Sequence, residues 1–324
     1  MTKYELTNGF LRVQISDYGA KITRLLVPNK EGKVADVVLG FEKDEEWQTK
    51  ETYFNAVIGR CANRIKDGRF ALDGKQYQLP VNNGTNSLHG GIHGFNEKTW
   101  KVEQHDATHI VLYYRSQDGE EGYPGNLDVW VTYRLTPENG LSVCYKARTD
   151  APTIVNFTNH AYFNLNGEDS PSVRNHLLQV LADTYTPFDE TACPTGDVLP
   201  VEGTPMDFRK PVMVSERIDD PFFVPGRGID NNWLLPASDS LRLAAKVTAD
   251  GRTMEVWTTA PALQVYTGNY VEENKGKSGV IYRPQNAICL ETQNVPDAIN
   301  HPNFPSPVLR PGETFESETE YKFV

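Results

Sequence analysis

Residues 156–165 combine one histidine with amides, a hydroxyl and aromatic rings. They read Asn-Phe-Thr-Asn-His-Ala-Tyr-Phe-Asn-Leu, with His160 in the middle and no acid or lysine nearby. A packed core has little use for so many polar groups in a row, because each buried one needs a partner. A neutral polyhydroxylated ligand needs this mixture: rings to stack on, amides to bind hydroxyls and one group that moves a proton. The segment therefore predicts a sugar site.

Three further side chains are of kinds that such a site uses. Arg64, in Asn-Arg-Ile, can fork onto hydroxyls or orient a carboxylate. His89, in Leu-His-Gly-Gly, stands beside glycines that permit close approach of a ligand. Glu291, in Cys-Leu-Glu-Thr-Gln, ends an apolar strand in a carboxylate. Taken singly, each also has a structural interpretation: a surface charge, a turn residue, and the partner of a buried backbone group or an arginine.

Together, His160 and Glu291 form an acid/base pair. Unperturbed imidazole and carboxyl groups have pKa values of ~6.5 and ~4.3, so one can hold a proton near neutrality while the other lacks one. The chain has no Gly-rich phosphate loop and no Gly-x-Ser-x-Gly nucleophile motif. His89 and His93 are four residues apart, but the glycines between them disfavour the helix that a zinc pair of this spacing needs. We expect proton transfer without a metal or other cofactor.

The composition argues against several partners and compartments. The 324 residues carry a formal net charge of −11 and a pI near 5.2, which argues against nucleic acid and disfavours phosphorylated substrates. No apolar run approaches the ~18 residues of a membrane span, and no signal peptide is visible at the start. We expect a cytoplasmic protein whose cysteines are free buried thiols: Cys61, Cys144, Cys193 and Cys289.

Strand patterns dominate the chain. Alternating apolar and polar residues predict strands over 11–15, 127–135, 241–248 and 253–259. Dipeptides that tolerate the positive φ of hairpin turns lie between candidate strands, at 73–74, 139–140 and 250–251. Helical periodicity is limited to short stretches at 42–49 and 214–218.

The fold expected from these patterns is one domain over residues 1–324, all-β, a large antiparallel β-sandwich with few short helices. Unusual composition collects in segments that we expect to be long loops on this scaffold. These loops are 81–95, 117–126, 156–167, 221–233 and 290–307.

The chain resembles the aldose 1-epimerases, or galactose mutarotases, nearly from end to end. Short pieces recur in the family's order, and their number makes the likeness specific. They are residues 58–65 (Ile-Gly-Arg-Cys-Ala-Asn-Arg-Ile), 86–91 (Asn-Ser-Leu-His-Gly-Gly), 94–95, 158–165 (Thr-Asn-His-Ala-Tyr-Phe-Asn-Leu), 228–230 (Gly-Ile-Asp), 263–269 (Leu-Gln-Val-Tyr-Thr-Gly-Asn), 290–293 (Leu-Glu-Thr-Gln), 296–298, 300–302 and 304–306.

The resemblance implies a single galactose mutarotase-like supersandwich with the sugar in an open cleft on one sheet. It implies that His160 is the general acid on the ring oxygen and Glu291 the general base on the C1 hydroxyl. Arg64, His89 and Asp230 would hold sugar hydroxyls, with no cofactor or metal. Where the family often has a histidine and then Asn-Phe after this aspartate, the chain has Asn-Asn-Trp, which leaves the preferred sugar open.

The resemblance therefore implies interconversion of the α and β anomers of free aldohexoses such as galactose and glucose, by a monomer or homodimer. Two alternatives remain. A hexose-phosphate epimerase would need several basic residues around the cleft, whereas the motif segments supply Arg64 and Arg60. A non-catalytic sugar-binding module on the same fold would be expected to lack the acid or the base, and the chain has both His160 and Glu291.

Overall fold

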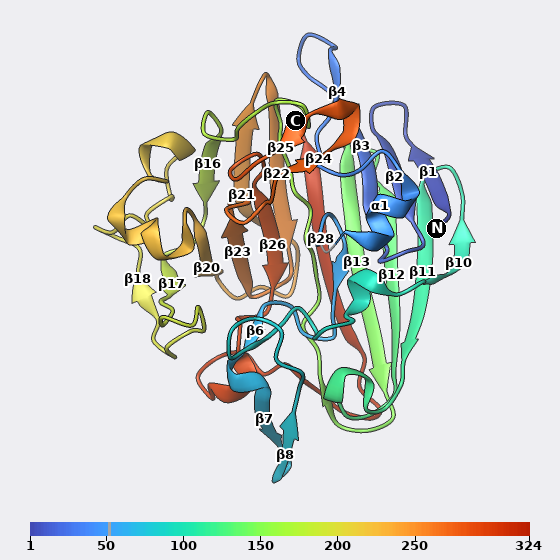
Figure 1. The fold of residues 1–324 in the computed structure, drawn as a ribbon, viewed down its shortest axis with the longest axis vertical. Helices are drawn as coiled ribbons and strands as arrows, with labels where there is room; N and C mark the ends of the chain where they lie inside the picture. Colours follow the sequence, from blue (N-terminus) through green and yellow to red (C-terminus); the bar gives the residue numbers. More distant parts are fainter. Residues whose placement is uncertain (51–52) are drawn as a thin grey trace.

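The computed structural model describes residues 1–50 and 53–324, and β-strands dominate it, as predicted. The C-terminal strand β28 lies in the middle of the largest sheet, between β13 and β22, so both halves of the chain close on it (Figure 1). This antiparallel nine-stranded sheet runs in the order β10 (Lys101–His105), β11 (His109–Ser116), β12 (Leu127–Leu135), β13 (Gly140–Thr149), β28 (Phe315–Phe323), β22 (Arg252–Thr258), β21 (Arg242–Ala249), β16 (Leu177–Val180) and β19 (Val212–Met213).

Two smaller antiparallel sheets form the second layer. One has the order β1 (Lys3–Thr7), β2 (Arg12–Ser16), β3 (Ile22–Pro28) and β4 (Val34–Asp36). The other has the order β18 (Leu199–Pro200), β17 (Thr184–Thr186), β20 (Asp230–Leu234), β23 (Ala262–Tyr266) and β26 (Cys289–Gln293). Apolar side chains of all three sheets meet in one buried cluster, which includes Val13, Leu25, Val131, Val143, Val256, Leu263, Leu290 and Tyr321.

Short strand pairs and helical turns occupy the connections. The pairs are β5 (Val57–Ile58) with β15 (Thr158–Asn159), β6 (Arg64–Ile65) with β9 (Ser87–Leu88), β7 (Arg69–Leu72) with β8 (Lys75–Gln78), β14 (Thr153–Ile154) with β27 (Val308–Leu309), and β24 (Asn274–Lys275) with β25 (Ile281–Tyr282). The helices are α1 (Asp44–Thr49) and the 3₁₀ turns η1 (Lys66–Gly68), η2 (Phe95–Glu97), η3 (Glu120–Gly122), η4 (Val214–Glu216), η5 (Pro221–Gly226), η6 (Lys277–Gly279) and η7 (Ala298–Asn300).

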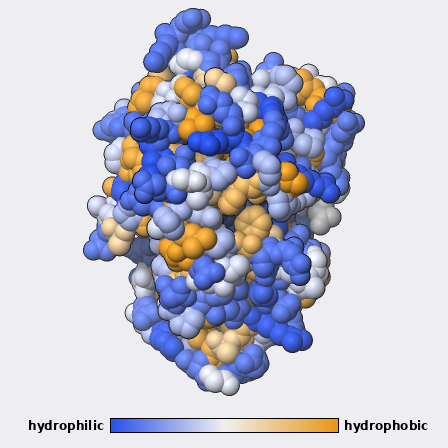
Figure 2. Space-filling view, turned by 90° about the vertical axis from the view of Figure 1, so that its left-hand side faces the viewer, coloured by the Kyte–Doolittle hydropathy of each residue, from blue (hydrophilic) through white to orange (hydrophobic). Residues whose placement is uncertain are grey.

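The helices are short and the surface is mostly polar. No helix in the described part of the chain is long and apolar enough to cross a membrane. The face shown in Figure 2 is largely hydrophilic, with apolar residues scattered over it in small groups. Such scattered apolar residues are ordinary on a folded surface.

The predicted elements are largely confirmed, with corrections that matter for the site. Strand β12 matches the predicted range, and the predicted turns join β7 to β8, β12 to β13 and β21 to β22. The segments predicted as loops at 81–95, 156–167, 221–233 and 290–307 are not all loop, because they contain β9, β15, the start of β20 and most of β26. Glu291 therefore lies in the middle of β26, and Asp230 begins β20. Val265 and Leu263 of β23 lie opposite Asn231 and Trp233 of this strand, so its polar start is fixed by a ladder in the sheet.

Leu290 shows how the core supports the chemistry. Its side chain is fully buried in the main cluster, and its carbonyl accepts a hydrogen bond from Tyr321 of β28 at 3.2 Å. We predict that Leu290→Ala lowers the free energy of unfolding by about 2–5 kcal/mol, because it removes buried methyl groups and leaves a cavity. Urea unfolding measures this, with the half-exposed Leu177→Ala as control, expected within about 0.5 kcal/mol of the wild type. Equal losses in the two variants would contradict this description of the core.

Candidate active site

The outward face of the five-stranded sheet presents a row of polar side chains. Glu291 of β26 lies opposite Gln264 of β23, Gln264 lies opposite Asn232 of β20, and Asn232 lies opposite Thr186 of β17. The Asn232 amide donates to the Thr186 hydroxyl at 3.0 Å. Because side chains alternate between the two faces of a strand, Leu290 points to the core while Glu291 points to this row.

The loop after β15 brings His160 to the same place. The His160 N–H donates to the Ala56 carbonyl at 2.9 Å, and the His160 carbonyl accepts from the Asn55 N–H at 2.9 Å. The Asn159 amide reaches into the core and donates to the Tyr133 hydroxyl at 2.9 Å. Asn55 also accepts from the Tyr162 N–H at 2.9 Å through its side chain. Backbone and amide hydrogen bonds on both sides therefore fix the imidazole, and the neighbouring amides are structural.

His160 and Glu291, which are far apart in the sequence, form the closest contact between titratable groups of the site. The distance from His160 Nε2 to Glu291 Oε1 is 3.6 Å, and the two side chains are only 5% and 3% exposed. Within the described chain, His160 Nδ1 and Glu291 Oε2 have no hydrogen-bond partner. A buried polar atom without a partner is rare, and it is expected where a ligand supplies the missing contact.

Burial shifts both groups of the pair toward their uncharged forms. It lowers the pKa of His160 to about 3. It also raises the pKa of Glu291 well above 4.5, and the nearby Asp230 carboxylate adds to this rise while the Arg64 charge opposes it. Between these two pKa values the pair therefore holds one proton, and burial favours the arrangement with that proton on the carboxyl.

His89 stands beside this pair with a defined tautomer. Its ring centroid is 5.2 Å from that of His160, and its Nδ1 accepts from the Asn63 N–H at 3.1 Å. Because Nδ1 uses its lone pair in this bond, the proton of the neutral ring is on Nε2. The side-chain atoms of His89, His160 and Glu291 that could coordinate a metal lie within 4.8 Å of one another. A metal ligand needs a free lone pair, which this tautomer does not offer, so the cluster fits hydrogen bonding better than metal binding.

The glycine after His89 serves the fold and not the ligand, which corrects the sequence-based interpretation. Gly90 has a φ of +91°, and a Cβ atom there would lie 1.9 Å from the Gly59 carbonyl oxygen. Glycine is required at this position because the backbone at Gly90, next to His89, packs directly against the backbone at Gly59.

Arg64 and Asp230 complete the predicted set, and the structure brings all of its members together. The Arg64 Nε–H donates to the Asn83 side chain at 2.9 Å, and the Asp230 carboxylate accepts from the Gln264 amide at 2.7 Å. Burial raises the pKa of Asp230, while the Arg64 charge and the Gln264 hydrogen bond lower it. The guanidinium therefore acts electrostatically on both carboxylates of the site.

Sequence reasoning missed two members of the site, Gln264 and Tyr53. Gln264 is buried and lies between Glu291 and Asp230, and its position as a polar residue in an alternating strand was the available signal. The Tyr53 ring packs edge-on against His89 at 4.6 Å and stacks on His160 at 6.0 Å. No pattern in the sequence indicated Tyr53, because its contacts come from distant segments.

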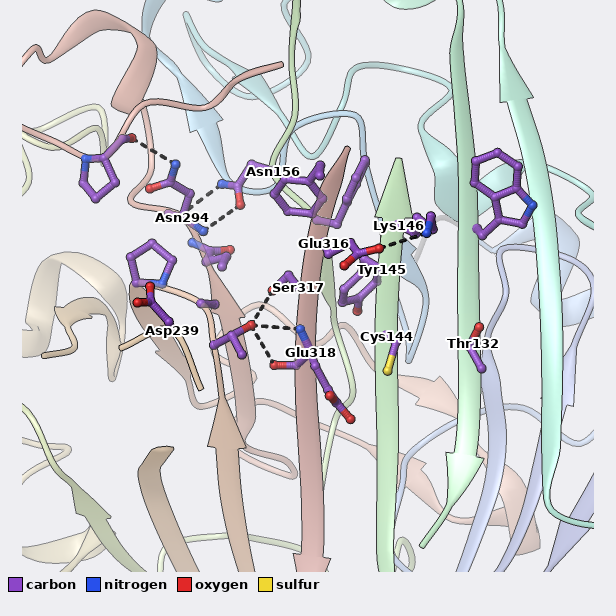
Figure 3. A pocket seen from close by; sticks show the side chains of 18 of the residues that line it. Thr132, Cys144, Tyr145, Lys146, Asn156, Asp239, Asn294, Glu316, Ser317 and Glu318 are labelled. Carbon is purple, nitrogen blue, oxygen red and sulfur yellow. Dashed lines mark hydrogen bonds and ion pairs between the residues drawn. The ribbon is translucent and has the colours of Figure 1, made fainter. Parts of the chain in front are cut away.

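A large groove lies elsewhere. It has a volume of about 1060 Å³ and lies against β12, β13 and β28 (Figure 3). Its lining includes Cys144, Glu318 and an ion pair between Lys146 and Glu316 at 2.9 Å, but none of the predicted site residues. Its volume would favour this groove as a ligand site, whereas the acid/base pair lies on the five-stranded sheet.

Comparisons with known proteins show what the whole chain is similar to. The family model described as aldose 1-epimerase matches residues 2–322. The chain is 47% identical to the galactose mutarotase of Homo sapiens, over 99% of this chain and 93% of that protein. It is 40% identical to the aldose 1-epimerase of Escherichia coli (strain K12), over 98% and 93%. The crystal structure of the GalM/aldose epimerase homologue from C. elegans superposes with a TM-score of 0.92 at 30% identity, covering 100% of this chain and 98% of that one.

The tautomer of His89 can be observed directly. We predict that at pH 6 this ring is uncharged with its proton on Nε2, because burial and the His160 and Arg64 charges lower its pKa well below 6.5. Two-dimensional ¹⁵N–¹H NMR of the histidine rings distinguishes the tautomers, and the signals lost in His89→Gln identify the residue. A charged ring or a proton on Nδ1 would contradict the geometry.

Proposed function

The chain belongs to the aldose 1-epimerase family, and we propose that it interconverts the α and β anomers of free aldohexoses such as galactose and glucose. The observation that carries this proposal is the buried His160–Glu291 pair, separated by 3.6 Å. An aldose changes its anomeric configuration by opening to the aldehyde, which requires a proton to leave the C1 hydroxyl and another to reach the ring oxygen. A paired base and acid can do both in one step.

In the proposed mechanism Glu291 removes the C1 hydroxyl proton while His160, as the imidazolium, protonates the ring oxygen. The bond between C1 and the ring oxygen breaks, the aldehyde forms, and rotation about C1–C2 presents its other face. The same groups then close the ring in reverse. Each positioned proton transfer typically contributes ~10²–10⁴ in rate.

The buried surroundings favour the ring-opening step. Before opening, the pair is a carboxylate and an imidazolium; after opening, the proton is on Glu291 and His160 is neutral. Burial shifts the pKa values of both residues toward this second state. The charge-separated pair is stabilised by the mutual attraction of its members and by Arg64, whose charge lowers the pKa of Glu291. The two states of the pair therefore hold the same number of protons. They differ in which residue carries the proton, which is transferred from His160 to Glu291 through the sugar.

The remaining polar groups suit the binding of hydroxyls. Arg64 and the Nε2–H of His89 can donate, whereas the Asp230 carboxylate accepts and is held by Gln264. This division into donors and acceptors would orient a neutral ring and discriminate among hydroxyl patterns.

A phosphorylated hexose is disfavoured by the position of Arg60. Its guanidinium donates to the backbone carbonyls of Ser116, Gln117 and Pro124 at 2.8–3.1 Å, and the residue is 2% exposed. It therefore cannot add to Arg64 in binding a phosphate, which needs several basic side chains.

We also propose a cytoplasmic location. The four cysteines support it, because all are free and three of them, Cys61, Cys193 and Cys289, are buried. Free buried thiols are typical of proteins of reducing compartments.

The acid/base pair is tested by substitution. We predict that Glu291→Gln and His160→Asn each lower kcat by about 10²–10⁴, because each removes one positioned proton transfer while keeping a similar shape. Polarimetry on freshly dissolved α-D-galactose and α-D-glucose measures the rate. Matched controls are Glu316→Gln, in the groove of Figure 3, and His105→Asn, on the surface, both expected to be as active as wild type. Near-wild-type mutarotation by either site variant would overturn the role of that residue.

The pH dependence follows from the shared proton. The active pair holds one proton; it gains a second only when His160 is also protonated, and the pKa of that group is lowered to about 3. The first proton is lost only above the ordinary carboxyl range, because the pKa of Glu291 is raised. We therefore predict that kcat/KM, corrected for spontaneous mutarotation, does not fall as the pH is lowered from 7 to 5. A decline with an apparent pKa near 6.5, in enzyme shown to be folded by circular dichroism, would contradict this.

A further inference from the structure

Asp297 connects the strand of the catalytic base to the strand of Arg64. It follows β26 by a short segment, is 4% exposed and adopts a left-handed backbone conformation with a φ of +55°. Its N–H donates to the Arg64 carbonyl at 3.0 Å, and its Oδ1 accepts from the Lys66 N–H at 3.1 Å. One residue therefore holds the backbone on both sides of position 65.

The carboxylate of Asp297 is itself held by its neighbours. Oδ1 also accepts from the Asn300 amide at 2.7 Å, and Oδ2 is 3.2 Å from Nε2 of His301. Burial raises the pKa of Asp297, and the Lys66 N–H, the Asn300 amide and His301 oppose the rise. The side chain thus has little freedom to move relative to the backbone that it contacts.

The two-strand ladder of β6 and β9, whose β6 strand Asp297 holds, positions two of the residues proposed to bind the sugar. β6 is only two residues long and pairs with β9, Arg64 opposite Leu88, and His89 follows β9 directly. From the other side, Lys66 Nζ lies 2.7 Å from Asp189 Oδ2, and the Asn86 amide donates to the Thr191 carbonyl at 2.8 Å. A ladder of two residues per strand does not by itself fix the distance of β6 and β9 from Glu291. The contacts of Asp297, Asp189 and Thr191 with these strands and their adjoining residues supply that constraint.

We propose that Asp297 is a positioning residue for the epimerase reaction, setting the location of Arg64 and His89 relative to the Glu291 strand. This inference rests on the proposed function, because it acts through the sugar-binding roles of those residues. Asp297 itself contacts the backbone of β6 and not the sugar. A displacement of about 1 Å in a binding group is enough to cost a large factor in turnover or binding.

The test is Asp297→Asn, which keeps the size of the side chain and tolerates the left-handed backbone. The substitution removes the negative charge from the hydrogen bond to the Lys66 N–H and from the contact with His301. We expect KM for α-D-galactose to rise about tenfold while kcat changes less than threefold. The matched control is Asp73→Asn, also at a positive φ, of +51°, but in an exposed ion pair with Arg310, and it should leave both constants unchanged.

A double-mutant cycle separates positioning from general destabilisation. Arg64→Ala should raise KM by itself, and adding Asp297→Asn to it should raise KM by less than the tenfold expected in the wild-type background, because part of the effect of Asp297 acts through Arg64. An unchanged KM in Asp297→Asn, or full additivity with Arg64→Ala, would overturn the positioning role while leaving the catalytic assignment intact. An unchanged KM in Arg64→Ala would instead overturn the proposed binding role of Arg64, and the inference with it.

Discussion

The site depends on one constraint: an imidazole and a carboxylate, held 3.6 Å apart and almost fully buried, hold a single proton between them. Burial disfavours the charged form of both groups, so it favours a neutral imidazole beside a protonated carboxylic acid. In the proposed mechanism, ring opening of a bound aldose brings the pair to that state, since the sugar relays the proton from His160 to Glu291. The rest of the structure holds these two groups, which are distant in the sequence, close together in space.

Strand β26 helps to position the pair because its two faces lie in different surroundings. Leu290 packs into the core and its carbonyl accepts a hydrogen bond from Tyr321 of the nine-stranded sheet, while the next residue, Glu291, lies in the polar row on the outward face. His160 is fixed comparably, because the preceding Asn159 anchors in the core on Tyr133. Each reacting group is therefore one residue away from a buried anchor, so its position is as rigid as the core itself. The binding residues Arg64 and His89 lie on a much shorter ladder, which needs a tether such as Asp297.

The sequence predicted the fold class, the three hairpin turns and a set of side chains that the structure places together, because each of these rests on local patterns or on motifs. It could not show that Asp230 begins a strand, since its polar neighbours resemble a loop and the ladder with β23 is made by residues more than 30 positions away. Gly90 was assigned to ligand approach for the same reason, because the Gly59 carbonyl that excludes a side chain comes from another segment. The pKa shifts and the position of Gln264 between two carboxylates also depend on contacts between distant segments. Such contacts cannot be read from the amino-acid composition.

The central claim concerns which oxygen of the sugar each group of the pair contacts. A crystal structure of Glu291→Gln with bound α-D-galactose tests it most directly, because the slowed enzyme retains the closed ring. The account predicts the sugar against the five-stranded sheet, with His160 Nε2 within hydrogen-bond distance of the ring oxygen and the side chain at position 291 on the C1 hydroxyl. A ring oxygen remote from His160, or a sugar bound only in the groove beside β12, β13 and β28, would contradict it.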